Sequence, residues 1–233
     1  MLKKPFLIYA DFESILESCE DKRHCQSKLY QSHVPCGYAY KRVATVAKHD
    51  KDIVKFRADK KEDNVADHFI KALLKEADDI MKIMKDIIPM NLTPTQEKEF
   101  RKSDTCFLCG GSFEGDKVHD HDHLTGEFRG AAHNRCNIKY GFKNYKIPVL
   151  FHNLKGYDSH FIVKALNKKI KNITCIPSST EKFITFSVNN LEFIDSQSFI
   201  QTSLERLVSS LAGTGFLQIS KTWKVLKNYL KFN

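Results

Sequence analysis

The sequence lacks any long apolar run. No stretch of its 233 residues approaches the ~18 consecutive apolar residues that a membrane span needs. The segment from Met1 to Asp11 contains two lysines and an acid, and its few apolar residues are too short for a signal-peptide core. These absences predict a soluble, intracellular protein with no membrane partner; the sequence leaves its oligomeric state unknown.

Acidic residues are also scarce relative to basic ones. The chain has 37 Lys and Arg against 28 Asp and Glu, a formal charge of +9, which favours an anionic partner such as nucleic acid. Between Asn137 and Asn172, eight lysines face a single acid, Asp158, and six aromatic residues lie among them: Tyr140, Phe142, Tyr145, Phe151, Tyr157 and Phe161. Lysines neutralise phosphates and aromatic rings stack on bases, so this pattern predicts single-stranded DNA binding. The alternative is a solvated face whose aromatic side chains point into the core.

Closely spaced cysteines are rare among the seven that the chain contains. An intracellular protein keeps its thiols reduced, so a close pair indicates a metal site before a disulfide. Only Cys106 and Cys109 have ligand spacing. The gaps around Cys19, Cys25 and Cys36 are irregular and disfavour a second site, and Cys175 lies in an apolar run that predicts a buried thiol.

Strand and helix patterns alternate along most of the chain. Apolar positions three and four residues apart predict a helix over Asn64–Ile88, and Thr93-Pro94-Thr95-Gln96 predicts a second helix that begins with a capping box. Further helices are expected at 159–167, 202–211 and 222–230, and strands at 5–10, 33–46, 52–58, 147–151, 173–176, 183–188 and 191–194. This alternation predicts an α/β sheet domain.

Residues 103–144 show neither period and are rich in Gly, Asp, His and Cys. Cys106-x2-Cys109 and His133-x2-Cys136 form two close pairs, and each pair can occupy one edge of a tetrahedral Zn²⁺. A segment with so few apolar residues has little other than a metal to fold around. The spacing therefore predicts a structural zinc module set into the chain.

Between the two pairs lies His119-Asp120-His121-Asp122-His123, and Asn137 follows the last cysteine. Asp and Asn oxygens can hold a divalent ion against a phosphate while a histidine takes a proton from water. These motifs, with Gly-x2-Arg-Gly between them, resemble recombination endonuclease VII, a ββα-metal (His-Me finger) nuclease. The resemblance places Cys106, Cys109, His133 and Cys136 on zinc ligands, although His133 stands where that family has cysteine. It places Asp120 and Asn137 on metal-binding positions and makes His121 catalytic.

A second acidic constellation lies outside that module. Asp11 and Glu13 alternate with Phe12 at the end of the first predicted strand, so both acids share one face and can share a metal. Asp158 follows a later buried strand. A third acid there would complete a two-metal phosphodiesterase site for Mg²⁺ or Mn²⁺.

These acids, with Asn153-x3-Tyr157-Asp158 and Ser203-Leu204-x2-Leu207, resemble the 3′→5′ exonuclease domain of protein-primed family B DNA-directed DNA polymerases of viruses and mobile elements. The resemblance implies an RNase H-like mixed sheet with flanking helices, and makes Asp11, Glu13 and Asp158 the catalytic metal ligands. It implies that the 3′ end of primer-template DNA contacts Ser14, Asn153, Tyr157, Ser203 and Leu204, and we add Lys155. Asp195 receives no metal.

Two parts of the polymerase pattern are missing. No Tyr or His has an Asp at the offset of the third exonuclease motif, and no palm follows before Asn233. We therefore expect a truncated proofreading region over 1–102 and 145–233, with the zinc module over 103–144 and a missing C-terminal polymerase partner, in the nucleus or at a replication site. The alternatives are a structure-specific endonuclease acting through the finger, and a DNA-binding remnant with both sites inactive.

Overall fold

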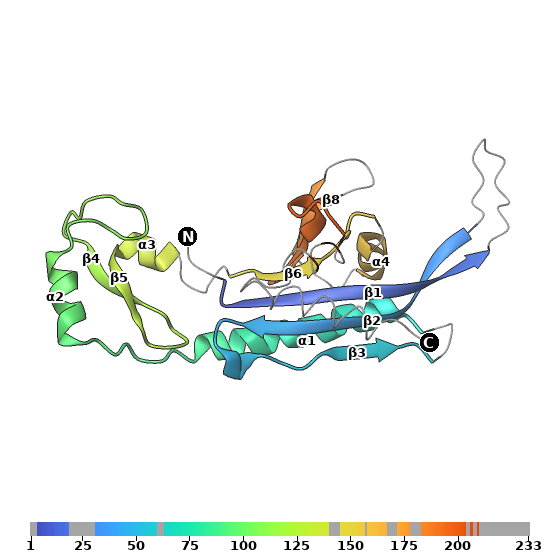
Figure 1. The fold of residues 1–233 in the computed structure, drawn as a ribbon, viewed down its shortest axis with the longest axis horizontal. Helices are drawn as coiled ribbons and strands as arrows, with labels where there is room; N and C mark the ends of the chain where they lie inside the picture. The colour runs from blue at the N-terminus through green and yellow to red at the C-terminus, as the bar shows by residue number, and fades with distance from the viewer. Residues whose placement is uncertain are drawn as a thin grey trace. The chain divides into compact units, whose positions relative to one another are not determined.

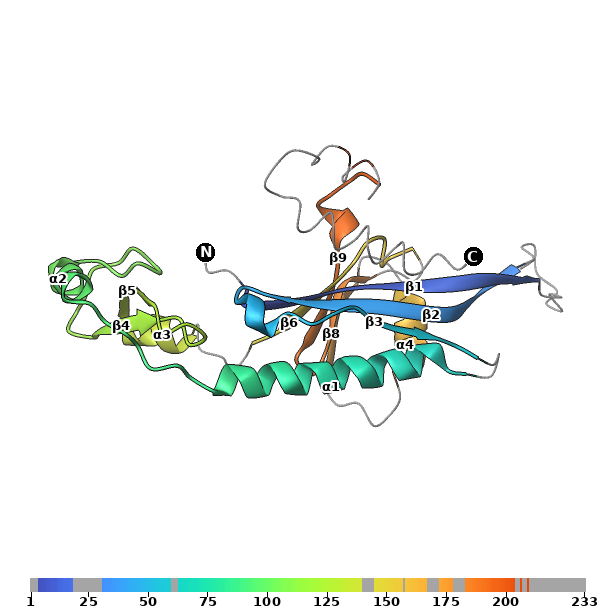
Figure 2. The same cartoon turned by 60° about the horizontal axis from the view of Figure 1, so that its bottom comes forward.

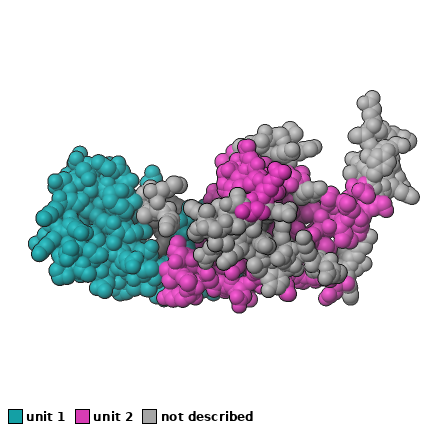
Figure 3. All heavy atoms as spheres, in the orientation of Figure 1, with its two compact units in different colours: residues 1–5, 76–146 teal, residues 6–75, 147–233 magenta. Residues whose placement is uncertain are grey.

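The computed structural model describes residues 4–18, 31–59, 63–139, 145–156, 158–166, 172–177, 183–203, 206 and 209. The chain forms two compact units (Figure 3). One unit contains residues 6–75 and 147–233 and holds a large sheet. The other contains residues 1–5 and 76–146 and holds a small two-stranded sheet. The cut between them falls within one long helix, so each unit is described by itself.

The large sheet is mixed and has seven strands in the order β3-β2-β1-β6-β9-β8-β7 (Figure 1). Its strands are β1 (Phe6–Ser18), β2 (Gln31–Ala44), β3 (Val54–Arg57), β6 (Ile147–Phe151), β7 (Ile173–Pro177), β8 (Phe183–Val188) and β9 (Leu191–Asp195). Two short 3₁₀ turns, η1 (Ala47–His49) and η3 (Ser196–Ser198), follow β2 and β9. Together with its helices, this sheet confirms the α/β class.

Three neighbouring strands in the middle of the sheet are parallel. Ile8 of β1 pairs with Val149 of β6, and Phe151 of β6 pairs with Asp195 of β9. The carboxyl ends of β6 and β9 therefore lie at one edge of the sheet, beside the middle of β1. The sequence predicts that the strand of Asp11 and the strand before Asp158 are neighbours, and the pairing of β1 with β6 confirms it. The predicted end of the first strand at residue 10 is wrong, because β1 continues to Ser18 in its pairing with β2, so Asp11 and Glu13 lie within the strand.

The two faces of β1 have different neighbours. Phe12 packs against Phe69 of α1 (Val65–Lys85) and Phe161 of α4 (Asp158–Ala165), with ring centroids 4.7 and 5.8 Å away. The first part of α1 and α4 thus cover the same face of the sheet (Figure 2). On the opposite face, Tyr9 packs in a smaller apolar cluster with Ala39. Asp11 and Glu13 alternate with Phe12, so they lie opposite the helical layer.

The predicted long helix is confirmed in its extent and in its apolar face. Helix α1 covers 65–85 within the predicted 64–88, and each of the six apolar positions that define the pattern is buried: Val65, Phe69, Leu73, Ala77, Ile80 and Met84. The predicted strands at 147–151, 183–188 and 191–194 also form, the last two in an antiparallel meander with β7. The predicted helix at 222–230 and most of the one at 202–211 lie outside the described residues.

The smaller unit is built on a ββα arrangement. β4 (Lys117–His121) pairs antiparallel with β5 (Phe128–His133), and α3 (Asn134–Lys139) follows β5 directly. α2 (Pro94–Lys102) precedes them and begins with the predicted capping box between Thr93 and Gln96. Residues 103–144 show no helical or strand period in the sequence, yet two short strands and a helix form there. The period is missing because polar and potential ligand residues interrupt the apolar alternation of these elements.

Contacts tie the ββα element to the chain that precedes it. The Ile88 and Asn91 amides donate to the carbonyls of His123 and Gly126. Gly126 has φ = +75°, and a Cβ there would lie 2.6 Å from the carbonyl oxygen of Pro89, so this turn requires glycine. The segment that is hydrogen bonded to the ββα element therefore begins near residue 88.

The structure corrects the predicted environment of several side chains. Cys175 is exposed rather than buried, because β7 is an edge strand. Phe151 and Phe161 are buried in the core, so for these two aromatics the alternative reading applies and they cannot stack on bases. Tyr140, Phe142 and Tyr157 lie outside the described residues.

In the described part of the chain, no helix is both long and apolar enough to cross a membrane.

Candidate functional site

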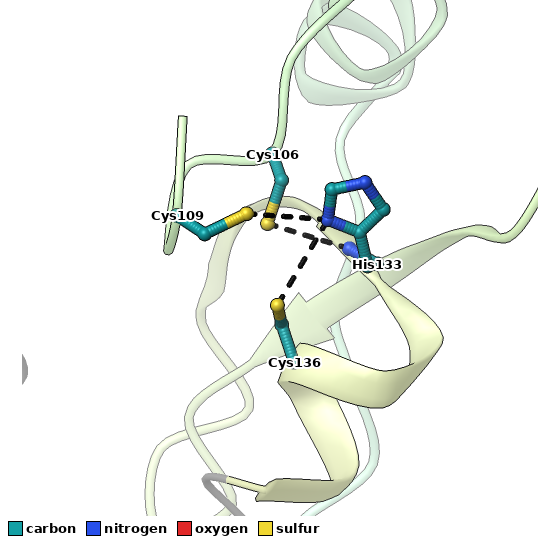
Figure 4. A group of neighbouring side chains, drawn as sticks. All are labelled: Cys106, Cys109, His133 and Cys136. Atoms are coloured by element: carbon teal, nitrogen blue, oxygen red, sulfur yellow. Dashed lines mark hydrogen bonds between the residues drawn. The ribbon is translucent and has the colours of Figure 1, made fainter. Parts of the chain in front are cut away.

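The four predicted zinc ligands converge. The thiols of Cys106, Cys109 and Cys136 and a ring nitrogen of His133 all lie within 4.8 Å of one another. Cys106 and Cys109 come from the loop before β4, His133 ends β5, and Cys136 lies in α3. Figure 4 shows the three sulfur atoms and the imidazole turned toward a common centre.

The imidazole of His133 is oriented by its surroundings. Its Nδ1 lies 3.4 Å from the Cys109 sulfur and 3.9 Å from the Cys136 sulfur, while its Nε2 lies 3.0 Å from the carbonyl oxygen of Ser112. The hydrogen bond to Ser112, opposed by burial and assisted by Cys106, Cys109 and the charge of Asp116, raises the pKa of His133 to about 9. Burial raises the pKa of the Cys106 thiol, but hydrogen bonds from backbone amides, first that of His133, outweigh it and bring the pKa to about 6.

This donor set fits Zn²⁺. A tetrahedral zinc site takes sulfur at about 2.3 Å and nitrogen at about 2.0–2.1 Å, which requires ligand atoms less than about 5 Å apart. Three thiols and one imidazole at that spacing, in a segment with few buried apolar residues, form a potential structural zinc site.

The Asp-His motif lies at the end of β4, where the strand has an irregular register between Asp120 and His121. Asp120 is 1% exposed, and both of its oxygens accept hydrogen bonds from Arg129, at 2.7 and 2.9 Å. A metal ion that binds Asp120 would have to share its carboxylate with this guanidinium or displace it.

Two histidines of the motif lie side by side. The ring centroids of His121 and His123 are 4.8 Å apart. The Nε2 atom of His121 is buried and has no hydrogen-bond partner among the described residues. Burial lowers the pKa of His123, and the neighbouring charges of His121 and Arg129 lower it further. A neutral imidazole of this kind can accept a proton. The sequence assigned His123 no role, and its spacing alone carries no signal of this pairing.

Asn137 lies in α3, one residue after the zinc ligand Cys136, and is partly buried. α3 packs against β4, which carries Asp120 and His121. The helix that bears Asn137 therefore lies beside the strand that bears the Asp-His pair, and the same helix carries one of the four potential metal ligands.

The second constellation is also brought together at the shared edge of the large sheet. Asp158, the first residue of α4, is 7% exposed. Burial raises the pKa of Asp158 well above its usual range, and the charges of Asp11, Asp195 and Glu13 raise it further. Repulsion between carboxylates raises a pKa when the groups lie close together. Residues more than 140 positions apart in the chain therefore share one acidic neighbourhood.

Asp195 has a distinct role in that neighbourhood. It is 2% exposed, and its oxygens accept hydrogen bonds from the backbone amides of Asn153, Lys155 and Gln197 at 3.0–3.1 Å. Asp195 therefore holds the loop between β6 and α4, in which Asn153 has φ = +71°. Its oxygens therefore have a structural role as acceptors for backbone amides.

The structure describes some of the remaining predicted DNA contacts. Lys155 donates from Nζ to the Ser198 hydroxyl at 2.7 Å, and the Ser14 hydroxyl is hydrogen bonded to His33 Nδ1 at 3.2 Å. Ser203 is exposed. Tyr157 and Leu204 lie outside the described residues. The sequence did not single out the hydrogen bond between His152 and Ser196, 3.0 Å long, which joins the ends of β6 and β9.

Comparison with known protein families identifies the finger. Residues 87–156 match the recombination endonuclease VII family. This segment is an endonuclease VII-like domain. The match covers less than half of the chain and includes the zinc cluster, the Asp-His motif and Asn137. No curated protein and no solved structure matches the chain.

Proposed function

We propose that this chain is a DNA endonuclease that cleaves through its ββα finger. The observation that supports this most is the coincidence of the endonuclease VII match with a converged Cys₃His cluster and an Asp-His motif whose Asp120 is buried. A nuclease domain acts on a polyanion, and the +9 charge of the chain suits DNA.

The roles of the residues follow from their chemistry. Cys106, Cys109, His133 and Cys136 would bind a structural Zn²⁺. Asp120 and Asn137 offer oxygens that would hold Mg²⁺ or Mn²⁺, which supplies charge neutralisation at the scissile phosphate when bound. His121 would accept the proton of the attacking water. His123, neutral because of its lowered pKa, would limit repulsion beside the protonated base.

Cleavage of branched and linear duplex DNA by the zinc-loaded chain with Mg²⁺ or Mn²⁺ tests this proposal. His121→Ala should lower the rate by about 10²–10⁴-fold, the usual contribution of a general base. His160→Ala is the matched control, because His160 is exposed in α4 of the other unit. Equal rates for His121→Ala and the wild type, or no cleavage by the wild type, would contradict the proposal.

A second candidate function is 3′→5′ exonucleolytic trimming at Asp11, Glu13 and Asp158. The electrostatic coupling of Asp158 to both other acids favours it. The three neighbouring parallel strands β1, β6 and β9 support the RNase H-like description of the sheet. Two divalent ions bound by the three carboxylates would activate water and neutralise the leaving oxygen.

On this second proposal, the sheet is the proofreading region of a family B polymerase that needs a C-terminal partner for synthesis. The same proposal includes two domains: an exonuclease domain formed by 1–102 and 145–233, and a zinc module formed by 103–144. It also includes contacts with a single-stranded 3′ end by Ser14, Asn153, Lys155, Tyr157, Ser203 and Leu204. So does a place in the nucleus or at a replication site.

Two variants separate the candidates. Alanine at both Asp11 and Glu13 should abolish trimming of a labelled 3′ end and leave internal cutting intact, whereas His121→Ala should do the reverse. If both activities are absent while single-stranded DNA still binds, the chain is a DNA-binding remnant with two inactive sites.

A further inference from the structure

We propose that Asp116 is a positioning residue for the zinc ligand His133, which binds the metal through Nδ1. The inference deepens the proposed function at the zinc cluster. It rests on zinc binding by the four ligands and does not require DNA cleavage.

The contacts of the imidazole assign its two nitrogens. Nε2 lies 3.0 Å from the carbonyl oxygen of Ser112. A carbonyl can only accept a hydrogen bond, so Nε2 must carry a proton. In a neutral ring, Nδ1 is then the atom with a lone pair, and Nδ1 is the nitrogen that faces the sulfurs of Cys109 and Cys136 (Figure 4).

Asp116 lies behind the protonated nitrogen. Its Oδ1 is 4.0 Å from His133 Nε2 and is buried, with no hydrogen-bond partner among the described residues. At 4.0 Å the carboxylate acts through its charge, while the direct hydrogen bond goes to the Ser112 carbonyl. The Asp116 side chain as a whole is 38% exposed, but this one oxygen is buried beside the ring, where a polarised N–H compensates for its lost hydration.

The backbone holds Asp116 in this place. The Asn134 amide donates to the carbonyl oxygen of Asp116 at 2.9 Å, and the next residue, Lys117, pairs with His133 across the β4–β5 ladder. Asp116 is therefore fixed relative to the ligand by the same strand pair that ends in His133.

This arrangement explains how histidine serves where the resembled family has cysteine. Replacing a thiolate by a neutral imidazole removes one negative charge from the metal's ligands. When Nδ1 binds Zn²⁺, the ring becomes electron-poor and its Nε2–H more positive. A carboxylate behind that N–H stabilises the bound form and makes the imidazole a stronger ligand.

Zinc affinity measured by competition with a chelator tests the role of Asp116 in the full chain. Asp116→Asn should weaken binding by about 10–100-fold, the usual effect of losing an outer-shell partner. Glu114→Gln is the matched control, because Glu114 is exposed two residues away and loses the same charge. Equal affinities for the Asp116 variant and the control would overturn the proposal.

A double-mutant cycle separates positioning from a general charge effect. In a His133→Cys background there is no imidazole to polarise, so Asp116→Asn should no longer weaken zinc binding. If it weakens binding equally in both backgrounds, Asp116 does not act through His133 and the proposal is wrong.

The protonation of the ring gives a readout that a general loss of stability does not move. Long-range ¹H–¹⁵N spectra of the zinc-loaded chain should show His133 with a protonated Nε2 and a metal-bound Nδ1. The reverse pattern would overturn the assignment. If the wild-type chain binds no zinc, the failure lies with the proposed zinc site itself.

Discussion

The finger and the large sheet are stabilised by different means. Over residues 87–139 the buried apolar side chains are few and mostly small: Cys106, Leu124, Ala131 and Ala132. The sheet, in contrast, buries large apolar side chains completely, among them Phe6, Phe69, Phe151 and Phe193. Burial of apolar area stabilises a sheet without help from a ligand, whereas the finger has little apolar burial and brings four potential metal ligands together.

The two regions therefore differ in how directly their sequences indicate a function. In the finger, the four cysteine and histidine side chains that converge also lie within the segment that matches the endonuclease VII family, so sequence similarity indicates a function there. In the sheet, the buried apolar side chains indicate only a fold. Asp11, Glu13 and Asp158 come from distant segments and share one acidic neighbourhood only in the folded chain.

Removing the metal should produce the largest effect and should affect only the finger. Chelation, or Cys106→Ala, should unfold residues around 103–141, because zinc supplies roughly 10–16 kcal/mol of apparent binding energy in comparable small modules. Hydrogen exchange should show loss of protection in β4, β5 and α3 and unchanged protection in β1 and β6. Cys175→Ala, at an exposed thiol, serves as the control. Equal loss of protection in both sheets would mean that the finger is not an independent metal-dependent unit.

A core truncation should produce the reverse pattern. Phe69 is fully buried and contacts the rings of Phe12, Tyr38 and Phe151 at 4.7–5.9 Å. Phe69→Ala should lower the free energy of unfolding of the sheet by about 3–5 kcal/mol, and zinc affinity should stay unchanged. Urea unfolding of the zinc-loaded chain measures the first effect and chelator competition the second.

The matched control is Phe199→Ala, because Phe199 is 62% exposed. If Phe69→Ala also weakens zinc binding, the two regions are energetically coupled and the contrast between them does not hold.

Neutralising Asp158 should stabilise the sheet, with a smaller effect than Phe69→Ala. Burial and the charges of Asp11, Asp195 and Glu13 raise the pKa of Asp158 in the folded state above its value in the unfolded chain. Folding therefore favours the protonated form, and stability falls as the pH rises through the folded-state pKa. Asp158→Asn should raise the melting temperature at neutral pH, and the gain should vanish below the unfolded pKa of about 3.9.

Mn²⁺ extends this test to the proposed metal site. A divalent ion would offset the repulsion, so Mn²⁺ should raise the melting temperature of the wild type more than that of Asp158→Asn. Asp52→Asn, at an exposed acid, should behave as the wild type does. A lower melting temperature for Asp158→Asn at neutral pH would show that the carboxylates do not repel one another in the folded chain.

The same contrast explains what could be predicted from the sequence. The helix 65–85, the strand 147–151 and the capping box at Thr93 follow from local spacing and local hydrogen bonds, which the sequence displays directly. The predicted zinc ligands follow from the spacing of Cys106-x2-Cys109 and His133-x2-Cys136, because the two residues of each pair can bind one metal ion. Exposed Cys175 could not be predicted, because apolar content does not reveal which strand lies at an edge. Two sets of hydrogen bonds could not be predicted either, because they join residues that only folding brings together: those from Arg129 to Asp120, and those from the loop at 153–155 to Asp195.

The smallest predicted effect tests how tightly folding of the finger is coupled to its metal. The Thr93 hydroxyl accepts a hydrogen bond from the Gln96 amide and caps α2, which contacts the finger through Glu97 and His119, 3.0 Å apart. Thr93→Ala should cost about 1 kcal/mol of stability. If the finger folds only when zinc binds, that cost appears as a roughly fivefold weaker zinc affinity. Thr95→Ala, at an exposed position in the same turn, controls for the loss of a threonine side chain. A finger that folds before it binds metal would instead show a lower melting temperature in the metal-free chain and an unchanged zinc affinity.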